Sequence, residues 1–222
     1  LCKESITKAV ALLNNYTVEG VEEIKNLETL TDKYEDKLST YLVRISHNNL
    51  SEAQSHAVAR LLHSIGDFER IGDHALNISD AATEIFEKKI QFSKGAIEEL
   101  KVTTAAVLDI LDKAVTAFVE DNAELATHVE PLEQVVDDLR ATLKERHIER
   151  LQNGECTVEL GFVFTDILSN YERVSDHCSN IAVYTLQMNS DKLDAHKYLR
   201  NIKKSDNGYF DEYKTYSEKY SV

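Results

Sequence analysis

Four pairs of acidic residues are the part of this sequence whose types and spacing could support chemistry. In each pair a glutamate precedes an aspartate by four positions, and the pairs are Glu28/Asp32, Glu69/Asp73, Glu133/Asp137 and Glu172/Asp176. On an α-helix this spacing brings both side chains to one face. Converging carboxylates need a counter-charge. Oxygen-only ligands suit hard or borderline cations such as Mg, Mn, Fe or Zn, and a multinuclear site is feasible.

Spacing alone is weak evidence for such a site. With 39 acidic residues in a chain of 222, roughly seven pairs of this kind would arise by chance. The four pairs gain weight because they recur at equivalent positions of two similar halves. Asn77 and Asn180 extend the stripe by one turn, so an amide is expected beside the carboxylates. The pattern by itself still leaves two interpretations open, a solvated acidic face and a metal cluster.

Helices must position these pairs, because the composition does not suit a β-rich or wound-sheet fold. The chain has only 7 Gly and 1 Pro, and its apolar residues recur at three- and four-residue steps almost throughout. Residues typical of helix ends divide the pattern. We predict capping boxes at Ser51/Gln54 and Asp121/Glu124, and helix starts at Ser93 and Thr157. We predict helix breaks at Asn48-Asn49 and Asn153-Gly154, and a kink at Pro131.

An internal duplication organises these helices. Residues 67–79 and 170–182 share Glu, Arg, Asp, His, Asn and Ile at a constant offset of 103, since 172 − 69 = 103. Upstream, residues 27–32 match residues 132–137 at an offset of 105. We therefore predict an all-α fold of two tandem three-helix bundles, 1–92 and 93–189, followed by a polar, Tyr-rich tail at 190–222.

Charge and composition narrow the class of function. The net charge of −14 argues against nucleic acid and against direct lipid binding. No window reaches the roughly 18 apolar residues of a membrane span, no signal peptide opens the chain, and three cysteines without CxxC spacing fit a cytoplasmic setting. Because the sequence starts at Leu1 and its only methionine is Met188, further sequence is expected upstream.

The repeated segments at 68–78 and 171–181 resemble the signature helices of PhoU-type proteins. Residues 147–154 are similar to the PhoU-like domain of bacterial sodium/phosphate cotransporters. This resemblance implies two three-helix repeats and no catalysis. It implies divalent or trivalent metal binding through Glu28, Asp32, Glu69, Asp73, Glu133, Asp137, Glu172 and Asp176. It further implies a regulatory role in phosphate uptake, with the chain attached to a membrane transporter on its cytoplasmic side and within the same polypeptide.

Other functions stay open beside this one. A free-standing PhoU-type regulator is one alternative, and a metal-free helical adaptor that binds a basic partner segment is another. A ferritin-like di-iron enzyme is disfavoured, because none of the 8 histidines has a glutamate three positions earlier. His74 and His177 are expected to pack between helices or form hydrogen bonds rather than bind metal, and Cys178 is expected to lie in the core. The oligomeric state is left open, with a homodimer as one arrangement.

Overall fold

The computed structural model describes residues 1–188 and 208–222, and all regular structure in those ranges is α-helical. The first repeat forms α1 (Cys2–Leu12), α2 (Val18–Ser46) and α3 (Glu52–Glu87). The second forms α4 (Lys94–Val119), the short α5 (Ala123–Thr127), α6 (Val129–Gln152) and α7 (Val158–Met188), and α9 (Tyr209–Lys219) follows. The prediction of an all-α fold with two helical repeats is confirmed.

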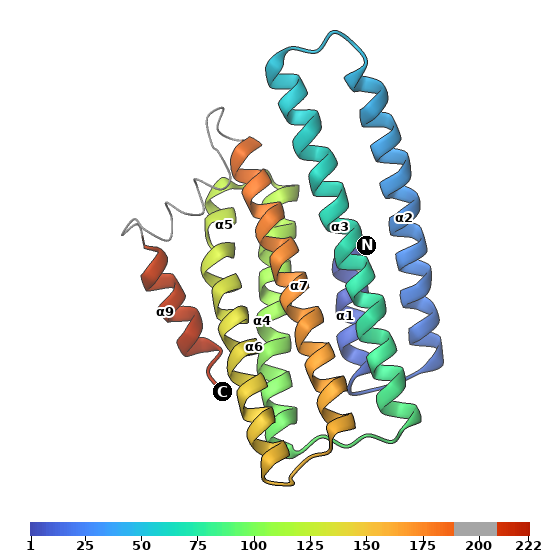
Figure 1. Cartoon of the computed structure of the whole chain (residues 1–222). Coiled ribbons are helices and arrows are strands. Elements are labelled where there is room, and N and C mark those ends of the chain that lie inside the picture. The colour runs from blue at the N-terminus through green and yellow to red at the C-terminus, as the bar shows by residue number, and fades with distance from the viewer. Residues whose placement is uncertain (189–207) are drawn as a thin grey trace.

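The two repeats pack along α3 and α7, the helices that end the first and second repeat. α3 lies against α7, and the buried apolar side chains of both repeats form one continuous core. The central residues of these two helices are fully buried, among them Ile71, Ile78, Val174 and Ile181. The hairpin of α2 and α3 extends beyond the rest of the bundle (Figure 1). Burial of apolar side chains along this contact thus holds α3 and α7, which carry two of the four acidic pairs, in place against each other.

Most of the helix boundaries follow the signals in the sequence. Ser51 and Gln54 form the predicted capping box at the start of α3, in which each side chain accepts a hydrogen bond from the other residue's backbone amide. Ser93 caps α4, and the Thr157 hydroxyl accepts from the amide of Leu160 at the start of α7. These side chains satisfy amide groups that the first helical turn leaves unpaired.

Two boundary predictions are wrong. Asp121 does not cap the helix that follows it: its backbone is in the left-handed region at φ 51°, and Asn122 instead accepts from the amide of Leu125. Pro131 does not kink a long helix either. The chain breaks at His128, between α5 and α6, and Pro131 lies in the first turn of α6, where its missing N–H costs no hydrogen bond.

The connection between α3 and α4 contains the predicted boundary between residues 92 and 93. Of the predicted tail, residues 190–207 lie outside the described part of the chain. α9 packs against α6. Its C-terminal end is anchored to α4, because Lys219 and Tyr220 both donate hydrogen bonds to Asp109. Within the described residues, no helix is both long enough and apolar enough to span a membrane.

Candidate metal centre

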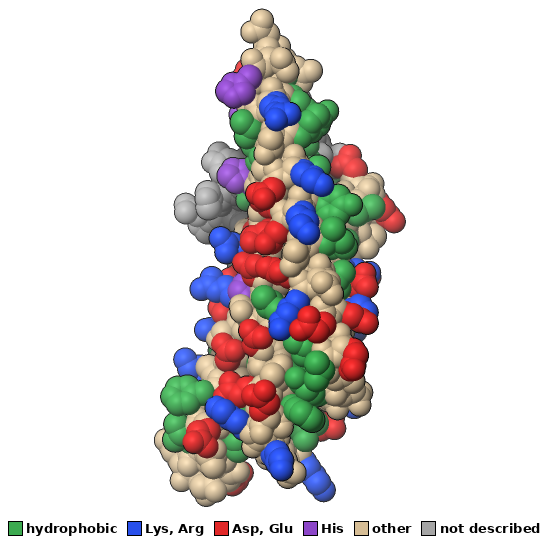
Figure 2. Space-filling view, turned by 90° about the vertical axis from the view of Figure 1, so that its right-hand side faces the viewer, with side chains coloured by type: hydrophobic (Ala, Val, Ile, Leu, Met, Phe, Trp, Pro, Cys, Tyr) green, Lys and Arg blue, Asp and Glu red, His purple; other side chains and the backbone are tan. Residues whose placement is uncertain are grey.

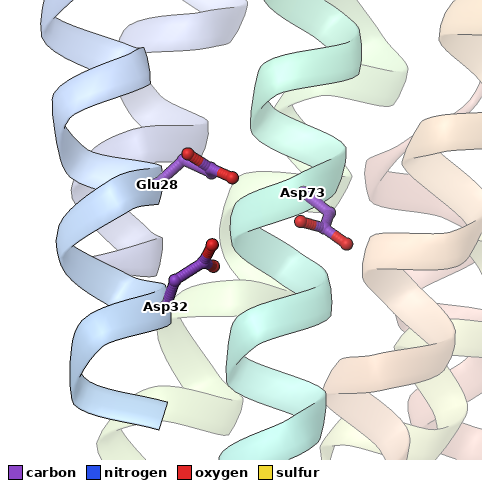
Figure 3. A group of neighbouring side chains, drawn as sticks. All are labelled: Glu28, Asp32 and Asp73. Atoms are coloured by element: carbon purple, nitrogen blue, oxygen red, sulfur yellow. The ribbon is translucent and has the colours of Figure 1, made fainter. Parts of the chain in front are cut away.

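In the first repeat, three carboxylates from two helices converge. Glu28 and Asp32 reach from one face of α2 toward α3, which carries Asp73 (Figure 3). One oxygen of each side chain lies within 4.8 Å of the others. Glu28 and Asp73 are half-buried and Asp32 is exposed. Three oxygen ligands at such spacing, open to solvent on one side, can hold a hard cation that keeps water in its other positions.

The second repeat builds the same arrangement from its own helices. Glu133 and Asp137 on α6 meet Asp176 on α7, again with one oxygen of each within 4.8 Å of the others. All three are half-buried. The two groups, which we call the first and second carboxylate groups, thus use repeat-equivalent positions, and the second is the more buried of the two.

The remaining glutamate of each repeat lies beside its group instead of within it. Glu172 forms an ion pair with Arg140, whose Nε lies 3.1 Å from the carboxylate. Glu69 lies 3.6 Å from the Nε of Arg70, its neighbour in sequence. Six of the eight predicted carboxylates are therefore brought together in two groups of three. The other two lie one beside each group, Glu69 near Asp73 and Glu172 near Asp176.

Electrostatics in both repeats favour a bound cation. Burial raises the pKa of Glu69, and the nearby charge of Asp73 raises it further. Burial likewise raises the pKa of Asp176, with Glu172 and Asp137 as the main charged contributors. A carboxyl group whose ionised form is disfavoured by like charges is stabilised when a cation joins it. The donor set and the charge distribution both fit a metal ion.

Nearby arginines neutralise these groups only in part. Arg70 lies 3.2 Å from Asp73, and Arg173 lies 3.5 Å from Asp176, each three residues apart on one helix. Both guanidinium groups are largely exposed. Exposed ion pairs of this kind contribute about 0–1 kcal/mol, so they leave most of the repulsion among the carboxylates in place.

Asn77 and Asn180 do not lie among the carboxylates, contrary to the expectation from their helical spacing. Asn77 donates to Asn170 across the contact of α3 with α7, and Asn180 donates to Asp67. The same two acceptors bind the histidines: Nδ1 of His74 lies 2.9 Å from Asn170, and Nδ1 of His177 lies 2.7 Å from Asp67. The two acceptors, Asn170 and Asp67, are buried and therefore require partners, which the exposed amides of Asn77 and Asn180 supply across the contact between the repeats.

The hydrogen bonds predicted for the two motif histidines and the predicted burial of Cys178 are observed. His74 and His177 form the hydrogen bonds just described, and burial lowers the pKa of His74, which favours its neutral form. Cys178 is fully buried.

Sequence reasoning missed Arg140. At the offset of 105 its counterpart in the first repeat is Glu35, so the two carboxylate groups differ by a reversal of charge at one equivalent position. That comparison between the repeats is the signal that could have found it. Because Arg140 compensates charge at the second group and Glu35 adds charge near the first, the two groups are not electrostatically equivalent.

Comparisons with known proteins agree with this architecture. A family model described as PhoU domain matches residues 1–82 and 104–185. The chain is 26% identical over 221 residues to a phosphate-specific transport system accessory protein PhoU homolog of Thermotoga maritima, and the match covers 94% of each chain.

Two solved structures share the fold. The crystal structure of PhoU from Pseudomonas aeruginosa superposes with a TM-score of 0.78 at 21% identity, covering 86% of this chain and 91% of that one. That of the phosphate transport system regulatory protein PhoU from Streptococcus pneumoniae gives 0.75 at 21%, covering 87% and 90%. The prediction that the chain is not an enzyme agrees with these relatives, whose names describe accessory and regulatory proteins.

Proposed function

Because the chain belongs to the PhoU family, we propose that it is a non-catalytic accessory regulator of a phosphate transport system. The observation that carries this proposal is the match to a PhoU accessory protein over 94% of both chains. That match favours a PhoU-type accessory regulator over the sodium/phosphate cotransporter domain that the resemblance in the sequence suggested. The partner is then a transport system at the cytoplasmic side of a membrane.

Metal binding is the chemical part of the proposal. Glu28, Asp32 and Asp73 hold one ion or cluster and the second carboxylate group holds another, with Glu69 and Glu172 beside them. A bound cation supplies positive charge that joins α2 to α3 and α6 to α7. The carboxylates of both groups would hold the ion, and its charge would relieve the repulsion among them.

Thermal unfolding tests the metal part directly. A ligand at a hundred times its Kd stabilises the native state by about 2.7 kcal/mol, which for a chain of this length is roughly 5–10 °C in Tm. We expect Mn, Fe or Zn to raise Tm after chelation, and Asp73→Asn with Asp176→Asn to abolish the rise. Asp36→Asn, an exposed acid one turn beyond Asp32, is the matched control. Equal melting temperatures with and without every metal would favour the metal-free adaptor.

A deletion strain tests the regulatory part. Loss of this chain should change how phosphate uptake responds to phosphate supply, and wild-type protein should restore the response. The variant with both aspartates replaced should fail to restore it, whereas Asp36→Asn should succeed. Uptake that responds to phosphate identically with and without the chain would refute the proposed function, whatever the metal measurements show.

A further inference from the structure

A cavity of about 680 Å³ opens at the end of the bundle where α3 passes into α4. Ile97 is 46% exposed in this cavity, and beside it Phe86 is 58% exposed and stacks on Tyr16, with 4.3 Å between the ring centroids. A concave site of this size with a mostly apolar lining is the usual form of a binding pocket. The apolar lining residues are Leu13, Ile85, Ile90, Phe92, Ile97 and Leu100.

The cavity also has polar groups that the fold does not use. The side-chain amides of Asn14 and Gln91 line it, and neither forms a hydrogen bond to another described residue. Lys101 lines it as well, and its ion pair with Glu98 is exposed and long, at 3.7 Å. These groups can bond to the backbone or to an acidic side chain of a bound segment.

The surface around the cavity is basic, although the chain as a whole carries a net charge of −14. Residues 88–97 contain three lysines and no acidic residue. Lys88 pairs with Glu84 at 2.7 Å, but Lys89 and Lys94 have no ion pair within residues 1–188 and 208–222. At this end, the lower one in both views, hydrophobic and basic side chains lie close together among acidic ones (Figure 2).

The first turn of α4 adds to this positive potential. Every other described helix has an acidic residue in its first turn, whereas α4 begins at Lys94 and has none there. The positive end of the α4 dipole is therefore left uncompensated beside the cavity.

Lys89 occupies a backbone position that favours glycine. Its φ is 54°, and the amide of the next residue, Ile90, donates to the carbonyl of Ile85. The end of α6 has the same arrangement, in which Glu155 donates to Arg150, but there the left-handed residue is Gly154 at φ 71°. A lysine at such a position costs stability that glycine would not. Its ammonium group has no partner in the described fold, which points to a use outside it.

We propose that this cavity binds an acidic segment of a partner protein, whose large apolar side chains enter it while its carboxylates meet Lys89, Lys94 and Lys101. Exposed charges act over about 10 Å at 0.1 M salt, so these lysines attract a short acidic segment despite the net charge of the chain. A second copy of this chain is disfavoured as the occupant, because its whole surface would bring −14 against −14. A membrane surface is disfavoured because the apolar contact is concave.

The proposal rests on the proposed function only for the source of the segment, which is then a component of the transport system. Peptide binding tests the cavity without any phosphate readout, so its failure is distinct from failure of the proposed function. The probe is a labelled peptide of leucine and glutamate, with leucine at three- and four-residue steps. A second peptide with lysine in place of every glutamate is its control.

We expect the acidic peptide to bind saturably to the full chain and the basic peptide to bind more weakly. Ile97→Asp should weaken binding of the acidic peptide at least tenfold, with unaltered circular dichroism, because Ile97 is half-exposed and an acid suits the first turns of a helix. Val43→Asp should bind as wild type does. Val43 is the matched control, because it is also 46% exposed on a helix but does not line the cavity.

Lys89→Gly separates binding from folding. It should raise Tm, since glycine suits the left-handed backbone, yet weaken the acidic peptide by about two- to fivefold, as loss of one exposed ion pair does. Lys37→Gln, at an exposed lysine of α2, should leave binding unchanged.

The absence of saturable binding would overturn the proposal, as would equal binding of the two peptides or binding that Ile97→Asp and Lys89→Gly leave unchanged. Binding to phosphatidylserine vesicles that Ile97→Asp abolishes would also overturn it, because the occupant would then be a membrane. A concentration-dependent dimer in sedimentation that Ile97→Asp dissociates would identify a second copy as the occupant and overturn it as well.

Discussion

Replacing Arg140 by glutamine should make the second carboxylate group bind a divalent cation more tightly. Arg140 follows Asp137 by three residues on α6, so their Cβ atoms lie about 5–6 Å apart. A unit charge about 8 Å from a divalent ion contributes about 1 kcal/mol at the dielectric constant of water. Because the effective dielectric constant near a protein surface is lower than that of water, about 1 kcal/mol, or about fivefold in Kd, is the smallest effect that we expect. The substitution also frees Glu172 to become a ligand, which acts in the same direction.

Calorimetric titration with Mn measures this effect when only one group can bind. Asp32→Asn disables the first group, and the Kd is compared with and without Arg140→Gln. The matched control lies in the other repeat, where Glu35 follows Asp32 by three residues. In a chain disabled by Asp137→Asn, Glu35→Gln should weaken binding by a similar factor. Both effects should shrink at high salt. An unchanged Kd for Arg140→Gln, with unaltered circular dichroism, would refute the electrostatic reasoning.

Two further predictions concern stability. Gly161→Ala should destabilise the protein by about 1–3 kcal/mol in urea unfolding, because the added Cβ would collide with Nε2 of the buried His147. Gly66→Ala is the control: a Cβ there meets open space, so the substitution should stabilise the protein by up to about 1 kcal/mol. Burial disfavours the charged form of Asp109, but hydrogen bonds from Lys113, Tyr220 and Lys219 outweigh this effect and lower the pKa of Asp109. Docking of α9 should therefore be complete above the ordinary pKa of aspartate, and it should be lost as the pH falls through the lower pKa of the native state. Hydrogen exchange of residues 209–219 measures this loss, and Asp109→Asn should remove the pH dependence and leave α9 exchanging rapidly at neutral pH.

Local signals were enough to predict the helical class, the repeat and most helix ends. Ser51, Ser93 and Thr157 act through hydrogen bonds within three residues, so their effect can be read from the sequence. The wrong cap at Asp121 shows the limit of such reading. Asp121 and Asn122 are both good capping residues, and only the backbone path after α4 decides between them.

The sequence predicts the part of the candidate site that lies within one helix, but not the contacts between helices. Helical periodicity places Glu28 beside Asp32, but the distance to Asp73 depends on how α2 packs on α3. The same applies to Arg140, which reaches Glu172 on another helix, and to Asn77, which turns toward the other repeat. Packing between helices determines which partners these side chains contact, and a single sequence carries no direct record of that packing.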